Sequence, residues 1–287
     1  MAKGDFPYGM GWLPDYPDIR DYTDAHEKVK PLFQKMGVDQ GDKLPPRIDL
    51  REWCSPIENQ GNIGACTAHA GVGLLEYYQR RSFGEHVDAS RRFLYKTTRN
   101  LLHWTGDTGA FVRTTMKALV LFGVPPEEYW MYKTAEFDEE PPAFCYAFAQ
   151  NYQAISYVRL GPPGHTKKEL FDRVRRYLAK GLPAMFGFTV YESIGAAKKT
   201  GLIPFPDPKE EVKGGHAVMA VGYDDTLVIK GNGTRTKGAF LIRNSWGEDW
   251  GDGGYGWLPY KYLMSGQAVD WWTLMKAEWV DTGNFGS

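Results

Sequence analysis

A cysteine at the expected start of a helix is the first feature of this sequence that could do chemistry. Cys66 follows the loop-forming run GNIGA and begins CTAHAGVGLLEYYQR, whose apolar spacing predicts a helix over residues 64–81. A thiol attacks as its thiolate, and the positive end of a helix dipole lowers the thiol pKa. Cys66 is therefore a candidate nucleophile, and a structural cysteine at a helix start is the alternative.

A histidine that could serve this thiol lies far along the chain. His216 stands at the mouth of an apolar strand in KGGHAVMAVGYDD, after two glycines that permit close backbone approach. Another apolar strand, in FLIRNSWGEDWGDGGYG, ends at Asn244, Ser245 and Trp246. An asparagine oxygen can accept from one imidazole nitrogen and turn the other toward a thiol. Trp246 would shield that hydrogen bond from water.

The other histidines are weaker candidates. His69 lies three residues after Cys66 on the same helix, which leaves little room for a substrate carbonyl between thiol and base. We expect His69 to be a core or surface histidine. The C-x-x-H spacing of Cys66 and His69 has no second ligand pair nearby, so the sequence predicts no metal site. The remaining histidines lie in polar or loop contexts: His26, His86, His103 and His165.

Composition excludes several classes of protein. The 287 residues carry a formal net charge of -1 and no long Lys/Arg block, so the electrostatic footprint of a nucleic-acid binder is missing. No apolar run is long enough to span a bilayer, and no signal segment is visible, so the compartment stays open. The 3 cysteines favour free thiols over a Cys54–Cys145 pair. We expect a monomer that binds neither nucleic acid nor membrane.

The secondary-structure elements that must position these residues change along the chain from predicted helices to predicted strands. Apolar spacing predicts helices over residues 64–81, 88–102, 110–122, 142–151 and 166–180. Strands are predicted over residues 153–160, 183–190, 216–224, 227–230, 239–244, 254–258 and 271–280. The fold class is therefore α+β: a helical lobe over about residues 55–150, then an antiparallel, barrel-like lobe over about residues 151–280. A ligand site is expected in the cleft between the lobes.

The first 43 residues differ from the rest in composition and in hydrophobic periodicity. They mix Pro, Asp, Gly and aromatic residues with little periodicity, apart from one short helix expected within residues 24–36. Two interpretations stay open for this leader. It is either a short pro-like strip that crosses the cleft with GWLPDYPDIRDY, or an extension packed on the lobe surface for stability.

Several blocks together resemble a known family. NQGNIGACTAHA, GGHAVMAVGY and RNSWGEDWGDGGYGWL resemble, in order, the three signature blocks of papain-like cysteine peptidases. RIDLREWCSPIENQG resembles the start of the mature domain, and DTGAFVRTTMKALVLFGVPPEEYWMY resembles one wall of the cleft. The resemblance covers about residues 44–280 and implies a papain-like two-lobe peptidase domain over 44–287. It also implies a peptidase without a cofactor, made as a zymogen, that hydrolyses peptide or protein substrates.

The resemblance also implies a role for each residue. Cys66 would be the nucleophile, His216 the general acid and base, and Asn244 the group that orients His216. Gln60 and the backbone N–H of Cys66 would form the oxyanion hole. The same resemblance implies a thiolate–imidazolium pair between Cys66 and His216. Substrate-binding positions carried over in the same way are Gly109, Thr108, Gly215 and Trp246.

The sequence departs from the family pattern in a few places. Ile63 and Thr67 stand where the pattern has a cysteine and a tryptophan, and Gly215 replaces an acidic residue. Asn244 follows Cys66 by 178 residues, more than the pattern expects, and the excess falls in a predicted hairpin tip at IKGNGTRTKG. These features match short bacterial members of the family. A catalytically idle peptide-binding module and a thiol acyltransferase are the alternative functions.

Overall fold

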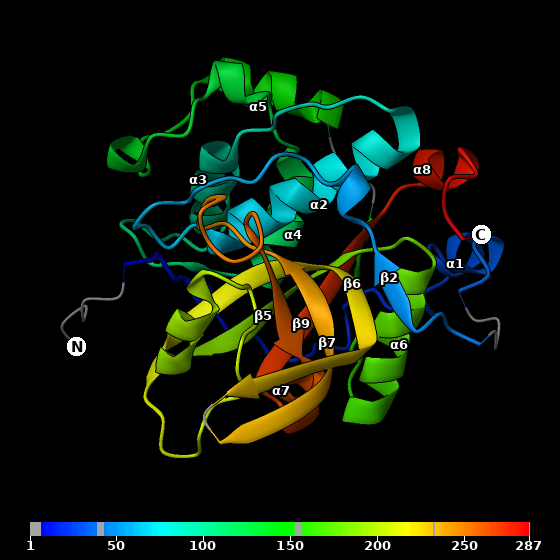
Figure 1. Ribbon diagram of the computed structural model, residues 1–287. Helices are drawn as coiled ribbons and strands as arrows, with labels where there is room; N and C mark the ends of the chain where they lie inside the picture. The colour runs from blue at the N-terminus through cyan, green and yellow to red at the C-terminus, as the bar shows by residue number, and fades with distance from the viewer. Residues whose placement is uncertain (1–6, 39–42, 153–155, 232, 287) are drawn as a thin grey trace.

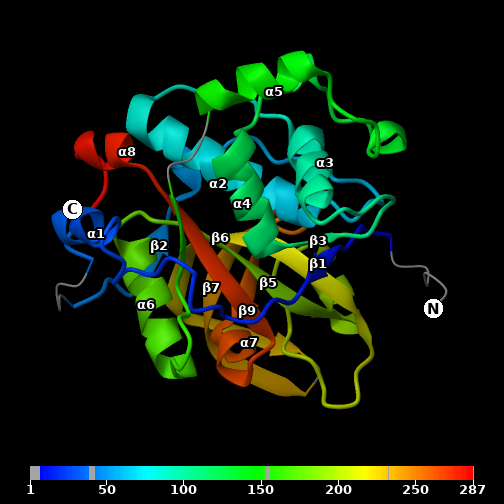
Figure 2. The same ribbon diagram turned by 180° about the vertical axis from the view of Figure 1, so that it is seen from behind.

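The computed structural model describes residues 7–38, 43–152, 156–231 and 233–286. Helices α2 to α5 gather on one side of the molecule and a large sheet fills the other (Figures 1 and 2). The predicted α+β class is confirmed, with helices first and antiparallel strands after them. The chain crosses between the two sides near both of its ends. An early strand, residues 47–49, pairs with the sheet, and a late helix, residues 277–281, packs against α2 on the helical side.

The helical side is built around one long buried helix. Helix α2 (Cys66–Phe83) is buried along most of its length and ends at Gly84, whose φ of 71° is a left-handed cap. The Ser90 hydroxyl accepts from the backbone N–H of Phe93 and caps the next helix. The other helices on this side are α3 (Arg91–Leu101), α4 (Val112–Phe122) and α5 (Ala143–Ala149).

The sheet has seven strands, all paired antiparallel. Its order is β4-β9-β5-β6-β7-β8, and β2 pairs with β6 off this path. Within the described residues no pairing joins β4 to β8, so the sheet is open. The strands are β2 (Arg47–Asp49), β4 (Ser156–Arg159), β5 (Ala184–Tyr191), β6 (Val212–Gly231), β7 (Thr234–Arg243), β8 (Tyr255–Pro259) and β9 (Ala268–Met275).

Some sequence expectations are corrected by the structure. The predicted strands 216–224 and 227–230 are one strand, β6, with an irregularity between Asp224 and Val228. The predicted strand 271–280 stops at Met275, and α8 (Ala277–Asp281) follows. Helix α7 (Tyr260–Ser265) was not predicted. Residues 153–155 of the predicted strand 153–160 lie outside the described residues.

Helix α6 (Lys167–Ala179) packs against the sheet and starts where the sequence predicts. The Thr166 hydroxyl accepts from the backbone N–H of Glu169, and the Glu169 carboxylate accepts from the backbone N–H of Thr166. This reciprocal capping box satisfies donors that the first turn would otherwise leave unpaired. Gly181 follows the helix with a φ of 77°.

The N-terminal segment crosses the molecule before the rest of the chain folds around it. Strand β1 (Trp12–Leu13) pairs in parallel with β3 (Ala110–Phe111), where the sequence predicts the start of a helix. The segment then runs along the junction of helices and sheet to α1 (Lys30–Lys35), the dark blue path in Figure 2. The position of α1 lies within the range 24–36 expected for a short helix.

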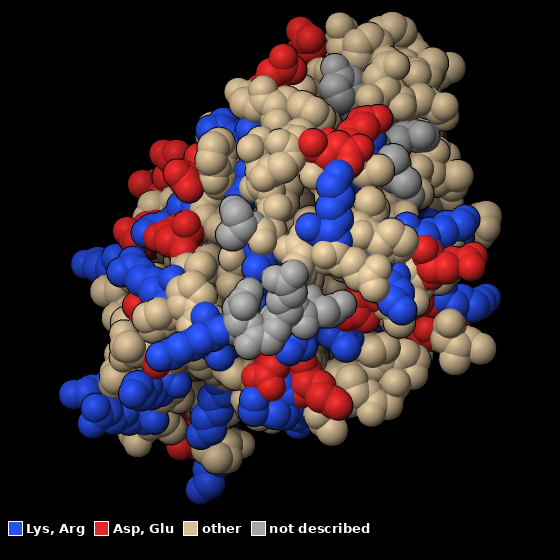
Figure 3. All heavy atoms as spheres, turned by 90° about the vertical axis from the view of Figure 1, so that its right-hand side faces the viewer, with Lys and Arg blue, Asp and Glu red and all other residues tan. Residues whose placement is uncertain are grey.

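Charges of both signs cover the face that carries α1, α6 and α8. Figure 3 shows Lys and Arg side chains next to Asp and Glu side chains on this face. One such pair joins Lys35 of α1 to Asp281 of α8 at 2.7 Å. Among the residues that the structure describes, no helix has the length and apolar character needed to cross a membrane.

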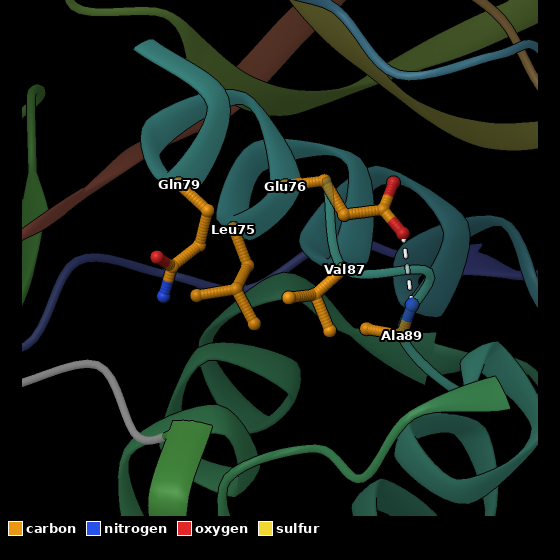
Figure 4. Close-up of a pocket in the computed structure, with 5 residues that line it drawn as sticks. All are labelled: Leu75, Glu76, Gln79, Val87 and Ala89. Atoms are coloured by element: carbon orange, nitrogen blue, oxygen red, sulfur yellow. Dashed lines mark hydrogen bonds between the residues drawn. The ribbon is translucent and has the colours of Figure 1, made fainter. Parts of the chain in front are cut away.

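A small hollow beside α2 is lined by Leu75, Glu76, Gln79, Val87 and Ala89 (Figure 4). Glu76 is buried, but its carboxylate accepts from the backbone N–H of Ala89 at 3.0 Å. The same carboxylate accepts from the Ser55 hydroxyl and pairs with the buried guanidinium of Arg91. Its charge is therefore balanced within the fold, and none of the predicted site residues lines this hollow.

The leader helix contributes to the core, which a substitution can test. Phe33 is 1% exposed and its ring lies 5.1 Å from that of Tyr177 in α6. Phe33→Ala should lower the free energy of unfolding by about 3–5 kcal/mol, measured by urea denaturation. Gln34→Ala, at an exposed position of the same helix, is the control and should change stability by less than about 0.5 kcal/mol. Equal stability of the two variants would show that the leader is not part of the core.

Candidate active site

Cys66 is the first residue of α2, and His216 lies on β6 beside it. Both side chains have no exposed surface. The backbone groups of Ala217 and Gly11 lie close enough to the Cys66 thiol to lower its pKa, so the strand that carries His216 runs past the sulfur. Pairing of Met219 with Arg243 brings the end of β7 to the same place. One helix start and two strands thus converge on the thiol.

The orientation of the His216 ring is fixed by Asn244. The imidazole Nε2 lies 2.7 Å from Asn244 Oδ1, and the backbone N–H of Ser245 donates to the same oxygen at 2.8 Å. An atom that receives the Ser245 N–H must be the amide oxygen, so His216 Nε2 carries the proton. Nδ1 is left with a lone pair and has no hydrogen-bond partner among the described residues. The ring therefore has one anchored nitrogen and one available base.

Trp246 covers the His216–Asn244 contact. Its ring stacks on the imidazole, with centroids 4.4 Å apart and an angle of 22° between planes. Trp250 packs edge-on against Trp246 and supports it from behind. Trp246 is 3% exposed and Asn244 is 2% exposed, so the bond is kept from water, as the sequence predicted.

The amide of Gln60 points into the same space. Its Nε2 donates to Ile63 O at 2.9 Å and to Gly9 O at 3.1 Å, and its Oε1 accepts from the Ser245 hydroxyl at 2.6 Å. Because both carbonyl oxygens need a donor, the NH₂ group must face them and the amide oxygen must face Ser245. One N–H of Gln60 thus holds its own loop and the other is aimed at a carbonyl oxygen in the site.

Burial holds both reactive groups in their neutral forms. Loss of water raises the pKa of the Cys66 thiol to about 11, although backbone hydrogen bonds from Ala217 and Gly11 act in the opposite direction. Loss of water also lowers the pKa of His216 to about 4, against the opposing effect of its contact with Asn244. At neutral pH this covered site therefore contains a thiol and an imidazole. The ion pair that the resemblance implies would require solvent access or a change of contacts.

The cover is part of the chain itself. Residues 8–13, here called the covering strip, lie over the thiol and the imidazole. Gly9 O accepts from Gln60 Nε2 and from Trp246 Nε1 at 3.2 Å. Gly11 O accepts from the backbone N–H of Ala110 at 2.8 Å. The backbone of the strip therefore accepts hydrogen bonds from Gln60, Trp246 and Ala110.

Two side chains of the strip add apolar contacts. Tyr8 stacks on Trp246 with centroids 4.6 Å apart. Trp12 is 6% exposed, and its ring fills the space beside Gly187 and Gly215, where an added Cβ would lie 1.9 Å and 2.8 Å from ring atoms. Only glycines allow an indole ring this close to β5 and β6.

The four predicted substrate-binding residues do not all lie in the same place in the structure. Gly109, with a φ of 73°, lies so close to Gly11 that an added Cβ would be 2.1 Å from Gly11 O. Gly215 and Trp246 also contact the strip, as described above. Thr108 is exposed, and its hydroxyl donates to Gly109 O at 3.1 Å. Gly109, Gly215 and Trp246 are thus brought together at the strip, whereas Thr108 faces away.

Sequence reasoning missed the group that holds the Gly109 loop. Asp107 Oδ1 accepts from the backbone N–H of Gly64 and from the Tyr95 hydroxyl, both at 2.7 Å. The Tyr95 oxygen in turn accepts from the backbone N–H of Gly109 at 3.1 Å. Asp107 therefore ties the loop before α2 to the loop at Gly109. An aspartate that opens a glycine-containing turn, as in DTGA, is the sequence signal by which it could have been found.

The remaining cysteines and His69 take no part in the site. Cys54, Cys66 and Cys145 are all free and buried, so the pairing of Cys54 with Cys145 left open by the sequence is not formed. His69 is buried edge-on against Tyr132, and burial holds its pKa well below the ordinary value. Within the described ranges, no group of three or more His, Cys, Asp and Glu could hold a metal ion.

The site lies between a layer of helices and a sheet. It combines a thiol at the start of a helix, a histidine hydrogen-bonded to an asparagine, and a glutamine amide. This combination defines the class of thiol-dependent hydrolases. The sequence profile described as papain family cysteine protease matches residues 44–266. The chain belongs to this family, and its fold is papain-like. It is a hydrolase of the cysteine endopeptidase class, which favours hydrolysis over the idle module and the acyltransferase.

Known proteins extend this similarity over nearly the whole chain. Xylellain, a cysteine protease from Xylella fastidiosa, is 32% identical with a TM-score of 0.76, over 94% of this chain and 97% of that one. An uncharacterized peptidase C1-like protein of Acanthamoeba polyphaga mimivirus is 30% identical over 96% of this chain and 89% of its own. Cathepsin K of Gallus gallus is 28% identical over 89% and 72%, respectively. The expected likeness to short bacterial members is confirmed by xylellain.

The Ser245–Gln60 contact can be tested without touching the thiol or the imidazole. Ser245→Ala removes a hydrogen bond worth about 1 kcal/mol, so Gln60 should lose its fixed orientation and kcat/KM should fall about fivefold, mainly through kcat. The backbone N–H of Ser245 still holds Asn244 in this variant. Ser265→Ala is the matched control, because the Ser265 hydroxyl lies on the surface and, among the residues that the structure describes, donates only to Tyr262 O. Both variants are measured in a Trp12→Ala background, which loosens the covering strip, and unchanged peptide turnover in Ser245→Ala would refute this role.

Proposed function

We propose that Cys66, His216, Asn244 and Gln60 carry out peptide hydrolysis in this chain. The observation that carries the proposal is the imidazole of His216, which Asn244 anchors at Nε2 while Nδ1 has no hydrogen-bond partner among the described residues. The next residue of the strand, Ala217, lies against the Cys66 thiol. Asn244 keeps the ring in the tautomer that a base needs. The four residues come from one chain, so we propose that it acts as a monomer.

Acylation begins with transfer of the Cys66 proton to His216 Nδ1. The sulfur attacks the substrate carbonyl carbon, and the carbonyl π electrons move onto oxygen. The oxyanion accepts hydrogen bonds from Gln60 Nε2 and from the backbone N–H of Cys66. When the carbonyl re-forms, the C–N bond breaks, and His216 gives its proton to the leaving amine. The product at this stage is a thioester on Cys66.

Hydrolysis of the thioester uses the same groups in reverse. Neutral His216 takes a proton from water, whose oxygen attacks the thioester carbonyl carbon. The second oxyanion rests on the same two donors, and the C–S bond then breaks. The thiolate and the imidazolium are restored, and the acid half of the peptide leaves. No further group is needed for the proton balance.

The substrate is an extended peptide that takes the place of the covering strip. The strip supports this, because its backbone bonds Ala110 and Gln60 and its Trp12 ring fills the space beside Gly187. Gly109 and Gly215 would let a substrate backbone approach in the same way. A net charge of -1 and a surface of mixed charge favour a peptide or protein substrate over nucleic acid or a membrane.

We also propose that the covering strip inhibits the full-length chain. It removes water from Cys66 and His216 and occupies the Gln60 donor through Gly9 O. A substrate carbonyl would need the same donor. The strip thus blocks the site while the rest of the leader serves the stability of the fold, so both interpretations of residues 1–43 apply to different parts of it.

A peptide epoxide probe tests the assignment of the nucleophile. In a Trp12→Ala background, which weakens the strip, the probe should label Cys66, and Cys66→Ala should abolish both labelling and peptide turnover. His216→Ala should reduce both strongly because the proton acceptor is lost. Gln60→Ala should lower kcat by a factor on the order of 10²–10³. Peptide mapping by mass spectrometry locates the label.

Cys54→Ala and Cys145→Ala are matched controls for a buried free thiol, and both should keep labelling and turnover. Turnover that survives Cys66→Ala, or a label that maps to Cys54 or Cys145, would exclude the proposed nucleophile.

A further inference from the structure

The covering strip crosses the place where two loops meet, and Gly11 contacts both of them. A Cβ added at Gly11 would lie 2.1 Å from Gly64 O, in the loop before α2. In the other loop, a Cβ added at Gly109 would lie 2.1 Å from Gly11 O, which also accepts from the backbone N–H of Ala110 at 2.8 Å. The relative position of the two loops therefore decides whether an extended backbone fits here.

The strip also shows how far a peptide must reach to use these contacts. Gly9 O accepts from Gln60 Nε2 at 3.1 Å, and Gly11 O accepts from the backbone N–H of Ala110. Two residues of extended chain between these carbonyl groups span about 7 Å. A substrate whose carbonyl oxygen lies at Gln60 thus needs two further residues to reach Ala110, and a substrate of one residue does not reach it.

One carboxylate joins the two loops. Asp107 Oδ1 accepts from the backbone N–H of Gly64 and from the Tyr95 hydroxyl, both at 2.7 Å. The Tyr95 oxygen accepts in turn from the backbone N–H of Gly109 at 3.1 Å. The tyrosine hydroxyl thus relays the contact, and hydrogen bonds connect Gly64 to Gly109 without a break.

Tyr95 gives these hydrogen bonds a rigid support. It lies on α3 with no exposed surface, and the guanidinium of Arg99 lies over its ring, 4.1 Å from the centroid. Burial, together with the negative charge of Asp107, raises the pKa of Tyr95 above its ordinary value, so the hydroxyl keeps its proton. A hydroxyl that donates to a carboxylate becomes a better acceptor, which strengthens its bond to Gly109.

The Gly64 end of this connection leads directly to the reacting groups. A Cβ added at Gly64 would lie 3.1 Å from Asp107 Oδ1 and 3.2 Å from the backbone nitrogen of Gly109, so the loops are in contact. Gly64 follows Ile63, whose carbonyl oxygen accepts from the Gln60 amide at 2.9 Å. The nucleophile is only two residues further along the chain. A shift of Gly64 would therefore move the site relative to the Gly109 loop.

We propose that Asp107 is a positioning residue that holds the Gly109 loop in a fixed place relative to the thiol and the oxyanion donors. The proposal rests on the proposed function of the site. Asp107 acts through the backbone of Gly64 and through the hydroxyl of Tyr95. A peptide bound at Ala110 is thereby placed with its carbonyl group at the thiol, where an error of about 1 Å is costly to the reaction rate.

This role requires a hydrogen-bond acceptor at position 107 and no negative charge. The amide oxygen of an asparagine can accept the same two hydrogen bonds, so Asp107→Asn should keep most of the function. Asp107→Ala should lose it. Tyr95→Phe keeps the buried ring and removes only the relaying hydroxyl, so it should behave like Asp107→Ala.

Two p-nitrophenyl esters with the same last residue separate positioning from a general loss of structure. One is an acylated tripeptide, which reaches Ala110, and the other is a formylated single residue, which does not. All variants are made in full-length Trp12→Ala, where the loosened strip affects both esters alike. Asp107→Ala should lower kcat/KM on the order of tenfold for the tripeptide and less than about twofold for the single residue.

Two further variants complete the comparison. Asp107→Asn should keep the tripeptide value within about threefold of the Trp12→Ala parent. Thr105→Ala, at an exposed position of the same loop, is the matched control and should leave both esters unchanged. Equal losses with both esters in Asp107→Ala, or an asparagine variant as poor as the alanine variant, would overturn the proposal.

The double variant Tyr95→Phe/Asp107→Ala tests whether the two side chains act as one unit. Because either substitution breaks the same connection, the double variant should lose no more tripeptide turnover than the poorer single variant. Losses that multiply would show two independent effects and would contradict the proposal.

Failure of the proposed function gives a different result. If Cys66→Ala in the Trp12→Ala background hydrolyses both esters as fast as its parent, the function proposed for the site fails, whatever Asp107 does. The rate of Cys66 alkylation by iodoacetamide should be the same in Asp107→Ala as in the parent, because the thiol and the imidazole stay in place. A tenfold change in that rate would show that Asp107 acts on the thiol itself and would overturn the positioning role.

Discussion

The contact between His216 and Asn244 is the interaction on which the site depends. It requires β6 and β7 to pair in one register, so that the residue after Arg243 meets the imidazole. The backbone of Ser245 fixes the amide of Asn244, and its hydroxyl fixes Gln60, so one short segment orients both the imidazole of His216 and the amide of Gln60. A shift in register would lose both at once. The layer of helices then needs only to bring the start of α2 against this edge.

Access of water controls the charge state of that site. The helix start and the nearby imidazole favour a thiolate, but complete burial favours the neutral thiol, and under the strip burial prevails. The strip acts by excluding water, and its Gly9 O accepts a hydrogen bond from Gln60 Nε2. The same residues can therefore be inert when covered and reactive when open, without rearrangement of the fold.

The sequence predicted the parts whose signals are local. Helix α6 carries its own capping box, and α2 shows its loop and its apolar spacing, so both were placed within about two residues. His216 and Asn244 were predicted from strand ends and from a resemblance spread over several blocks. Strands β1 and β3 were not predicted, because each has two residues and exists only through its distant partner. Helix α8 was not predicted, because it lies in an aromatic-rich run whose composition is typical of a strand.

The pH dependence of Cys66 alkylation tests most directly the claim that water access sets the state of the thiol. Iodoacetamide reacts with the thiolate, so the rate follows the thiol pKa. In the full-length chain the rate should stay low at neutral pH and rise only toward the pKa of about 11 that burial imposes. In Trp12→Ala, with the strip loosened, the rise should move to a pH well below the ordinary thiol pKa. The same high midpoint in both proteins would contradict the account.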